Sequence, residues 1–188
     1  MKTIKVIKVS MLSILLGGSL MAKECHNLSN IDIQWTSFKT LEKIGVSGDF
    51  FKYNLQTQKN LPSIIKALEA SSVKLDLKDL DAKADIKTNN IQSYFVKHLF
   101  STKVDAKIKK AYNTSLILEI TMNGVKRDIP FNYKLVGNKL NAKGYFDAGD
   151  FVMDKVMHIL ATGVAGHMNK GWDDIPVSFE LDYSKKCK

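Results

Sequence analysis

Five segments of the chain alternate apolar and polar residues at a period of two, which is the pattern of strands with one buried face and one wet face. The shared apolar faces consist of Val73, Leu75 and Leu77; Val104, Ala106 and Ile108; Leu116, Leu118, Ile120 and Met122; Ile129, Phe131, Tyr133 and Leu135; and Val177, Phe179, Leu181 and Tyr183. Turn signals at Asn123-Gly124 and Gly137-Asn138 separate consecutive strands. The pattern predicts an antiparallel meander that closes into a barrel, because closure removes exposed sheet edges.

Three short helices are expected to interrupt the strands. Asn60 caps the first, which has Pro62 in its first turn; Asn90 caps the second; the third begins at Asp150 and ends at Gly163. The apolar residues at helical spacing in these segments are Ile64, Ile65 and Leu68; Ile91, Tyr94, Phe95, His98 and Leu99; and Val152, Met153, Val156, Met157, Ile159 and Leu160. Because helices with so many apolar residues must bury them against another surface, we expect them to cover the open mouth of the barrel, with Met153, Met157 and Leu160 directed inward.

Residues 31–51 carry the most specific signal. An alternating strand runs through Trp35, and Gly45 and Gly48 bracket a return strand that ends in the aromatic pair Phe50-Phe51. The order Trp-x-x-x-Lys-Thr, then Gly-Val-x-Gly-x-Phe, resembles the opening of the YceI-like family. That family consists of secreted bacterial proteins with a lipocalin-like barrel that carries a long apolar lipid.

The resemblance extends along most of the chain. Residues 84–90, followed by His98-Leu99-Phe100, resemble the family's middle block, in which a strand leads into a short helical lid. Residues 116–133 resemble its central hairpin, and residues 173–177 its last strand. The resemblance implies an all-β fold: an antiparallel eight-stranded lipocalin-like barrel with short helices covering the mouth.

The start of the chain predicts a signal peptide over residues 1–22 and a barrel domain over residues 23–188. Lys2, Lys5 and Lys8 precede an apolar stretch of ten residues, and Ala22 is a small residue at a plausible cleavage point. The apolar stretch is shorter than the roughly 20 residues that a membrane-spanning helix needs. These features predict a periplasmic protein.

Cys25 and Cys187 are the only two cysteines, and they lie at the two ends of the mature chain. In an oxidising compartment such a pair is normally a disulfide. In an up-and-down barrel with an even number of strands, the first and last strands are antiparallel neighbours. The start of the first strand then lies beside the end of the last, so we expect Cys25 and Cys187 to be bonded.

The net charge of the whole chain is +9, and removal of residues 1–22 leaves 25 basic against 19 acidic residues, a charge of +6. We do not expect nucleic-acid binding, because Arg127 is the only arginine and nucleic-acid sites favour arginine. The lysines alternate with apolar positions along the strands, which indicates a solvated outer face. A general, weak attraction to anionic membrane surfaces is the secondary interpretation.

Catalytic chemistry finds little support in the sequence. His26, His98, His158 and His167 are dispersed, and none of the usual zinc, nucleophile or phosphate-binding motifs occurs. His158 and His167, with Asp173-Asp174, could together offer metal ligands, but partly exposed loop positions and turn chemistry explain them better. We therefore expect no enzyme activity, no cofactor and no metal.

An eight-stranded barrel is either filled by side chains or holds one small ligand. Composition alone favours a filled core; the family resemblance favours a pocket for a long-chain apolar lipid or isoprenoid. The side chains expected to line it, with two polar residues at its mouth, are Trp35, Phe51, Phe95, Phe131, Tyr133, Met153, Met157, Phe179, Asn89 and Asn90. The predicted function is a binding or carrier protein. The alternative is a non-enzymatic stress-response or interaction module with a filled barrel and a basic surface.

Overall fold

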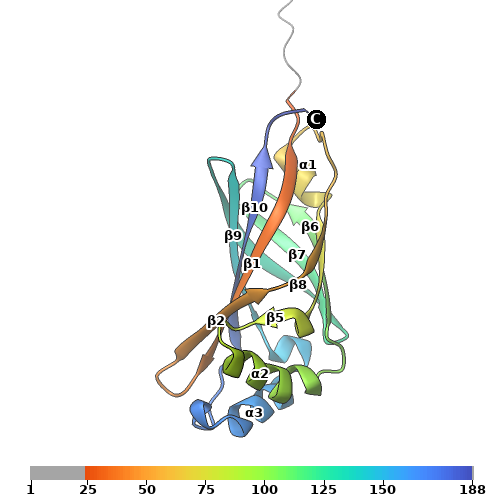
Figure 1. Ribbon diagram of the computed structural model, residues 1–188. Helices are drawn as coiled ribbons and strands as arrows, with labels where there is room; N and C mark the ends of the chain where they lie inside the picture. Colours follow the sequence, from red (N-terminus) through yellow and green to blue (C-terminus); the bar gives the residue numbers. More distant parts are fainter. Residues whose placement is uncertain (1–23, 188) are drawn as a thin grey trace, which may run out of the picture.

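The structure is a computed structural model that describes residues 24–187, so the signal peptide expected over residues 1–22 lies outside the described residues. Ten strand segments form one sheet (Figure 1). They are β1 (Asn27–Lys39), β2 (Ile44–Phe50), β3 (Tyr53–Gln56), β4 (Ser72–Asp76), β5 (Leu80–Asp81), β6 (Lys103–Ala111), β7 (Ser115–Met122), β8 (Val125–Val136), β9 (Lys139–Asp147) and β10 (Asp174–Ser184). Each strand pairs with its neighbours in antiparallel orientation.

The ten segments form an eight-stranded circuit, because two pairs of segments are continuous strands with a bend. β2 passes into β3 through residues 51–52, and β4 passes into β5 through a single 3₁₀ turn, η1 (Leu77–Asp79). β2 pairs with β5 and β3 pairs with β4, so the two ends of the sheet order, β3-β4-β6-β7-β8-β9-β10-β1-β2-β5, meet each other. β1 and β10 are antiparallel neighbours. The all-β, eight-stranded barrel expected from the sequence is therefore confirmed.

The predicted alternation places the apolar faces of the strands inside the barrel. The inward residues of β7 are all buried, and so are Ile129, Phe131 and Tyr133 of β8. Leu135 is the exception, because it is 42% exposed. It lies near the end of β8, one residue before the strand ends at Val136 and the turn that leads into β9 begins.

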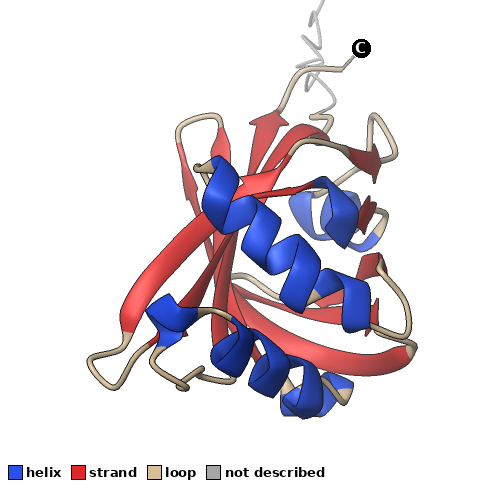
Figure 2. Ribbon diagram, turned by 60° about the horizontal axis from the view of Figure 1, so that its bottom comes forward, coloured by secondary structure: helices blue, strands red, loops and turns tan. Residues whose placement is uncertain are grey.

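Three α-helices cover the two ends of the barrel. They are α1 (Ile64–Glu69), α2 (Asp85–Tyr94) and α3 (Asp154–Gly163). α1 packs against β6 and β1 near one end, whereas α2 and α3 lie side by side across the opposite end (Figures 1 and 2). Three further 3₁₀ turns, η2 (Val96–His98), η3 (Gly149–Phe151) and η4 (Ala165–His167), flank α2 and α3. We refer to the end covered by α2 and α3 as the mouth.

The predicted starts of the first two helices were wrong. Ser63 caps α1, with its hydroxyl oxygen accepting the N–H of Lys66 at 3.2 Å. Asn60 instead adopts a φ of 59°, and its N–H donates to the Asn27 side chain at 2.7 Å. α2 begins five residues before the predicted cap, at Asp85, so Asn90 lies inside it.

The third helix also begins later than predicted, although it ends at Gly163 as expected. η3 and a left-handed residue, Val152 with a φ of 56°, precede its first turn. Met153, Met157 and Leu160 are each at most 5% exposed and face the interior, so the predicted inward face of this helix is confirmed.

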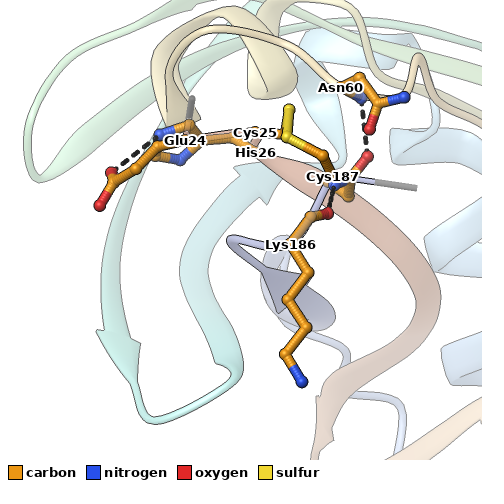
Figure 3. Close-up of a disulfide and its surroundings, with 7 residues drawn as sticks. Glu24, Cys25, His26, Asn60, Lys186 and Cys187 are labelled. Atoms are coloured by element: carbon orange, nitrogen blue, oxygen red, sulfur yellow. Dashed lines mark hydrogen bonds and ion pairs between the residues drawn. A yellow bond between two sulfur atoms is a disulfide. The ribbon is translucent and has the colours of Figure 1, made fainter. Parts of the chain in front are cut away.

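The end opposite the mouth contains the expected disulfide between Cys25 and Cys187, whose Cα atoms are 4.8 Å apart (Figure 3). Asn27 connects three chain segments there, since its side chain donates to the Lys186 carbonyl oxygen and accepts the Asn60 N–H, both at 2.7 Å. His26 Nδ1 lies 2.8 Å from the hydroxyl of Tyr183 on the neighbouring strand. We refer to this region as the disulfide end.

The disulfide closes a loop of 162 residues, so it restricts the unfolded chain strongly. We expect Cys25→Ala/Cys187→Ala to lower the free energy of unfolding by about 5 kcal/mol on the chain-entropy estimate. Guanidinium unfolding of both proteins measures this difference. Equal unfolding midpoints for the wild type and the double variant would contradict it.

The bend between β4 and β5 depends on one carboxylate. Asp76 Oδ1 accepts the N–H of Lys78 at 3.1 Å, and Asp76 Oδ2 accepts from Lys103 Nζ at 2.7 Å. Burial opposes ionisation of Asp76, but Lys103, the Lys78 N–H and the Thr102 hydroxyl outweigh it and lower the pKa of Asp76 from 3.8 to about 2. The charged form therefore stabilises the bend.

Because the folded pKa of Asp76 is depressed, its contribution to stability is complete above about pH 4 and is lost as the pH falls toward 2. We expect Asp76→Asn to be less stable than the wild type at pH 6, and the difference in free energy of unfolding to shrink between pH 4 and pH 2. Denaturant unfolding across this pH range is the measurement. A difference that does not change with pH would show that the charge of Asp76 does not stabilise the bend.

Candidate functional site

The barrel encloses a cavity of about 230 Å³ whose wall is almost entirely apolar. The inward rows of β1, β7 and β10 supply much of this wall: Ile31, Ile33 and Trp35; Leu118, Ile120 and Met122; and Ile175, Val177, Phe179 and Leu181. Leu75, Val104 and Ala106 continue it on β4 and β6. An apolar cavity of this kind stays dry and accepts apolar ligands.

The cavity is elongated along the strands. On β10 it is lined from Ile175 near the mouth to Leu181 toward the disulfide end. Six strand steps of about 3.3 Å give a lined length of roughly 20 Å. The hydrocarbon core of a bilayer, which holds two chains end to end, is about 30 Å thick. The cavity therefore has a length suited to one lipid chain.

Two glycines give the aromatic wall residues their positions. Gly144 on β9 lies opposite Phe131, and a Cβ atom at residue 144 would lie 2.6 Å from Cδ2 of the Phe131 ring. Gly48 on β2 lies opposite Trp35 in the same way, and a Cβ there would overlap the indole ring and the Asp81 carbonyl oxygen. Each ring thus lies over its glycine, which leaves the space in the centre of the barrel free.

The disulfide end of the barrel is filled by side chains. Leu28, Leu68, Leu116 and Leu140 are each at most 2% exposed and do not line the cavity. Tyr133 belongs to this filled region, and its hydroxyl donates to the carbonyl oxygen of Tyr112 at 2.7 Å. Burial raises the pKa of Tyr133, which keeps the hydroxyl protonated as a donor. The cavity is therefore closed at this end.

α2 and α3 form a lid over the mouth. Ile91 and Phe95 of the α2 segment, with Met157 and Leu160 of α3, line the cavity. The two helices contact each other closely where the Tyr94 ring lies against Gly163. A lid with methionine thioethers can adapt its surface to different chain shapes.

The turn residue Asn123 attaches the lid to the barrel. Its Nδ2 donates to the Phe151 carbonyl oxygen in η3 at 3.0 Å, and its Oδ1 accepts the Phe100 N–H at 2.7 Å. The side chain is buried, and its residue has a φ of 50° in the turn between β7 and β8. One turn residue thus holds both the segment that follows α2 and the segment that precedes α3.

Polar side chains line the cavity mainly at its mouth. They are Ser37 and Lys39 from β1, Lys87 and Asn90 from α2, and His167 from η4. Nδ1 of His167 is buried and has no hydrogen-bond partner. Burial lowers the pKa of His167, and the nearby Lys39 ammonium lowers it further, so the imidazole is neutral at pH 7.

Seven of the ten side chains that the sequence predicted for the pocket line this cavity: Trp35, Phe95, Phe131, Met153, Met157, Phe179 and Asn90. Phe51, Tyr133 and Asn89 do not. Phe51 is 68% exposed at the bend between β2 and β3, where its neighbour Phe50 faces the interior instead. Tyr133 lies in the filled end, and Asn89 is on the exposed side of α2.

Lys39 and Lys87 were not among the predicted pocket residues, and His167 was considered only as a possible metal ligand. A signal for Lys39 was present, because the inward alternation of β1 continues from Trp35 to Ser37 and Lys39. Lys87 precedes Asn90 and Ile91 by three and four residues, which is the spacing of one helix face. No comparable pattern indicates His167.

The residues considered for catalysis do not converge. His158 is exposed on α3, whereas His167 lies at the mouth. Asp174 pairs with Lys43 at 2.6 Å. Among residues 24–187, no group of His, Cys, Asp and Glu is arranged to hold a metal ion. Within the same residues, no helix combines the length and the apolar character needed to cross a membrane.

Comparison with known proteins gives matches at the level of structure. No protein-family model matches the chain, and no curated protein sequence is significantly similar to it. The structure of a polyisoprenoid-binding domain from Saccharophagus degradans, implicated in plant cell wall breakdown, superposes with a TM-score of 0.60 at 12% identity, covering 87% of this chain and 99% of that one. BcnA from Burkholderia cenocepacia gives a TM-score of 0.54 at 12% identity, covering 82% and 96%.

A variant of the Campylobacter jejuni YceI protein gives a TM-score of 0.54 at 17% identity, covering 79% of this chain and 90% of that one. At these identities the comparison establishes a common fold. The chain has the lipocalin-like barrel fold of the YceI proteins, in agreement with the resemblance in its sequence.

The position of Phe131 over Gly144 gives a prediction about the cavity. We expect Gly144→Ala to push the Phe131 ring into the cavity, to lower the free energy of unfolding by about 1–3 kcal/mol and to weaken binding of the apolar dye N-phenyl-1-naphthylamine. Dye fluorescence and denaturant unfolding are the measurements. The control is Gly45→Ala, whose Cβ would meet its nearest neighbour at 3.4 Å. Equal dye affinity for the two variants would show that Phe131 does not shape the cavity.

Proposed function

We propose that this protein is a periplasmic lipid-binding or carrier protein of the YceI-like family. It holds one elongated apolar ligand, a polyisoprenoid or a fatty-acid-derived lipid, inside the barrel without changing it chemically. The observation that carries this proposal is the apolar cavity itself, which is roughly 20 Å long on the strand rise and ends at a helical lid. The name of the polyisoprenoid-binding domain with the same fold supports the choice of ligand class.

The energetics of the cavity favour such a ligand. Burial of a chain yields about 0.8 kcal/mol per methylene, so a dozen methylenes yield on the order of 10 kcal/mol before the cost of association. The wall residues are held by the barrel and need little reordering. Affinity in the micromolar range or better is therefore attainable without any specific polar contact.

The cavity and the outer face both argue against the alternative, a filled interaction module with a basic surface. That module would use the basic outer face, but several lysines on this face are paired across strands, such as Lys109 with Asp128 at 2.6 Å. Lys139 bridges Glu180 and Asp182 at 2.8 and 2.7 Å. A solvated outer face, on which several lysines pair with carboxylates of neighbouring strands, fits a carrier whose function lies inside.

The proposed compartment rests on two features. The expected signal peptide directs the chain out of the cytoplasm, and the disulfide is of the kind that forms in an oxidising compartment. A carrier in the periplasm would keep an insoluble chain dispersed between membranes. Sequestration requires no catalytic group, in agreement with the dispersed histidines.

Phe131 offers a test because it is both buried and part of the cavity wall. In a close-packed core, Phe→Ala costs about 3–5 kcal/mol. We expect Phe131→Ala in lipid-free protein to cost about 2 kcal/mol or less, because one side of the ring already faces open space. Its affinity for palmitate should fall. Denaturant unfolding, paired with a palmitate titration, measures both effects.

Phe151→Ala is the matched control, because Phe151 is fully buried but does not line the cavity. We expect it to show the full loss of about 3–5 kcal/mol. A full core-sized loss for Phe131→Ala, together with a wild type that binds no lipid, would show that the barrel is filled and would overturn the carrier proposal.

A further inference from the structure

The mouth of the cavity indicates what kind of head group the ligand carries. Resting on the proposed function, we propose that the ligand is a single-chain lipid with an anionic head group, a carboxylate or a phosphate, which Lys39, Lys87 and His167 bind at the mouth. The apolar chain then extends inward between the strands. Three elements that are distant in sequence supply these three side chains.

The first observation is the change of character along the inward row of β1. The row is apolar from Ile31 through Trp35 and becomes polar at Ser37 and Lys39, where the strand reaches the mouth. A purely apolar ligand would gain nothing from this change. An amphipathic ligand with its polar end at the mouth matches this change, because its apolar chain then contacts the apolar part of the wall and its head group contacts the polar part.

The second observation is that the two lysines lack carboxylate partners. Neither Lys39 nor Lys87 forms an ion pair with any residue between 24 and 187. By contrast, the nearby lysine Lys83, just before α2, pairs with both Asp49 and Asp81. Two unpaired ammonium groups at the rim of an apolar cavity attract an anion, because the low-dielectric wall strengthens their field.

The third observation is the unsatisfied imidazole of His167. Its Nδ1 atom is buried without a partner, and leaving a buried polar group without a hydrogen bond is unfavourable. Lys39 Nζ lies 3.6 Å from the position that a Cβ on Gly166 would occupy, so the ammonium group lies beside the backbone that precedes His167. A head-group oxygen at the mouth could accept from Lys39 and, with the ring proton on Nδ1, from His167 as well.

The three groups therefore form one oxyanion site at the end of an apolar channel. A free anion would bind the oxyanion site but leave the apolar channel empty. A neutral lipid such as a long-chain alcohol would fill the channel but form no ion pair with the lysines. An anionic single-chain lipid does both, so it is the ligand that the arrangement fits.

The experiment compares ligands with the same chain and different head groups. Palmitate, hexadecyl phosphate and hexadecanol are titrated into the mature wild-type protein, into Lys39→Met/Lys87→Met, and into the control Lys134→Met/Lys143→Met. The control removes the same charge from exposed lysines on the outer face of β8 and β9. A separate titration adds inorganic phosphate to the palmitate complex.

For the wild type and the control variant, we expect binding of at least one of the two anionic lipids to be about tenfold or more tighter than binding of hexadecanol. In Lys39→Met/Lys87→Met this preference should fall below about threefold, while hexadecanol affinity stays within about twofold of the wild type. Inorganic phosphate at millimolar concentration should not displace palmitate.

Equal wild-type affinity for all three lipids would overturn the anionic head group and leave the carrier function intact. A preference that survives in Lys39→Met/Lys87→Met, or displacement of palmitate by phosphate alone, would likewise overturn the assigned site. No binding of any of the three lipids would contradict the proposed function itself.

Discussion

The structure depends on one constraint of volume: an eight-stranded barrel has just enough interior to be filled by its own side chains, so it is hollow only where those side chains are small or displaced. Both conditions occur here. Gly48 and Gly144 lack side chains and lie beneath the rings of Trp35 and Phe131. Toward the disulfide end, leucines and Tyr133 fill the same interior. The cavity is the part of the barrel that the side chains leave unfilled.

The two ends of the barrel consequently have different roles. The disulfide end joins the first and last strands covalently and through Asn27, which contacts two further segments of the chain. The mouth is covered by helices that contact the barrel through a few residues, among them Asn123. Stability concentrated away from the ligand leaves the mouth free to adapt, because elements that open for a ligand belong to the less stable part of a fold. The disulfide therefore does not restrict the mouth, where we propose that the ligand enters.

The sequence predicted the barrel well, because period-two alternation is a local signal that the tertiary structure reinforces. It predicted helix starts poorly, since Asn60 has the residue type of a cap but bonds to the Asn27 side chain instead, and Asn90 lies inside α2. Phe51 and Tyr133 could not be placed from the pattern, because neither the bend after β2 nor the depth of filling is encoded locally. Lys39, Lys87 and His167 were not predicted as one group, because they come from three elements that are distant in sequence. The residues of the cavity wall were easier to predict from the sequence, because the alternation that marks a buried residue also marks one that faces the barrel interior.

The central claim is that a lipid chain occupies the interior of the barrel, and the methionines allow it to be tested directly. Met122, Met153 and Met157 line the cavity, whereas Met168 is 75% exposed and lies outside it. Protein labelled with ¹³C at the methionine methyl groups is mixed with palmitate, and nuclear Overhauser contacts between lipid methylenes and protein methyls are recorded. The account predicts contacts to Met122, Met153 and Met157 but none to Met168. Contacts to Met168 alone, or binding without any contact to the three cavity methionines, would contradict it.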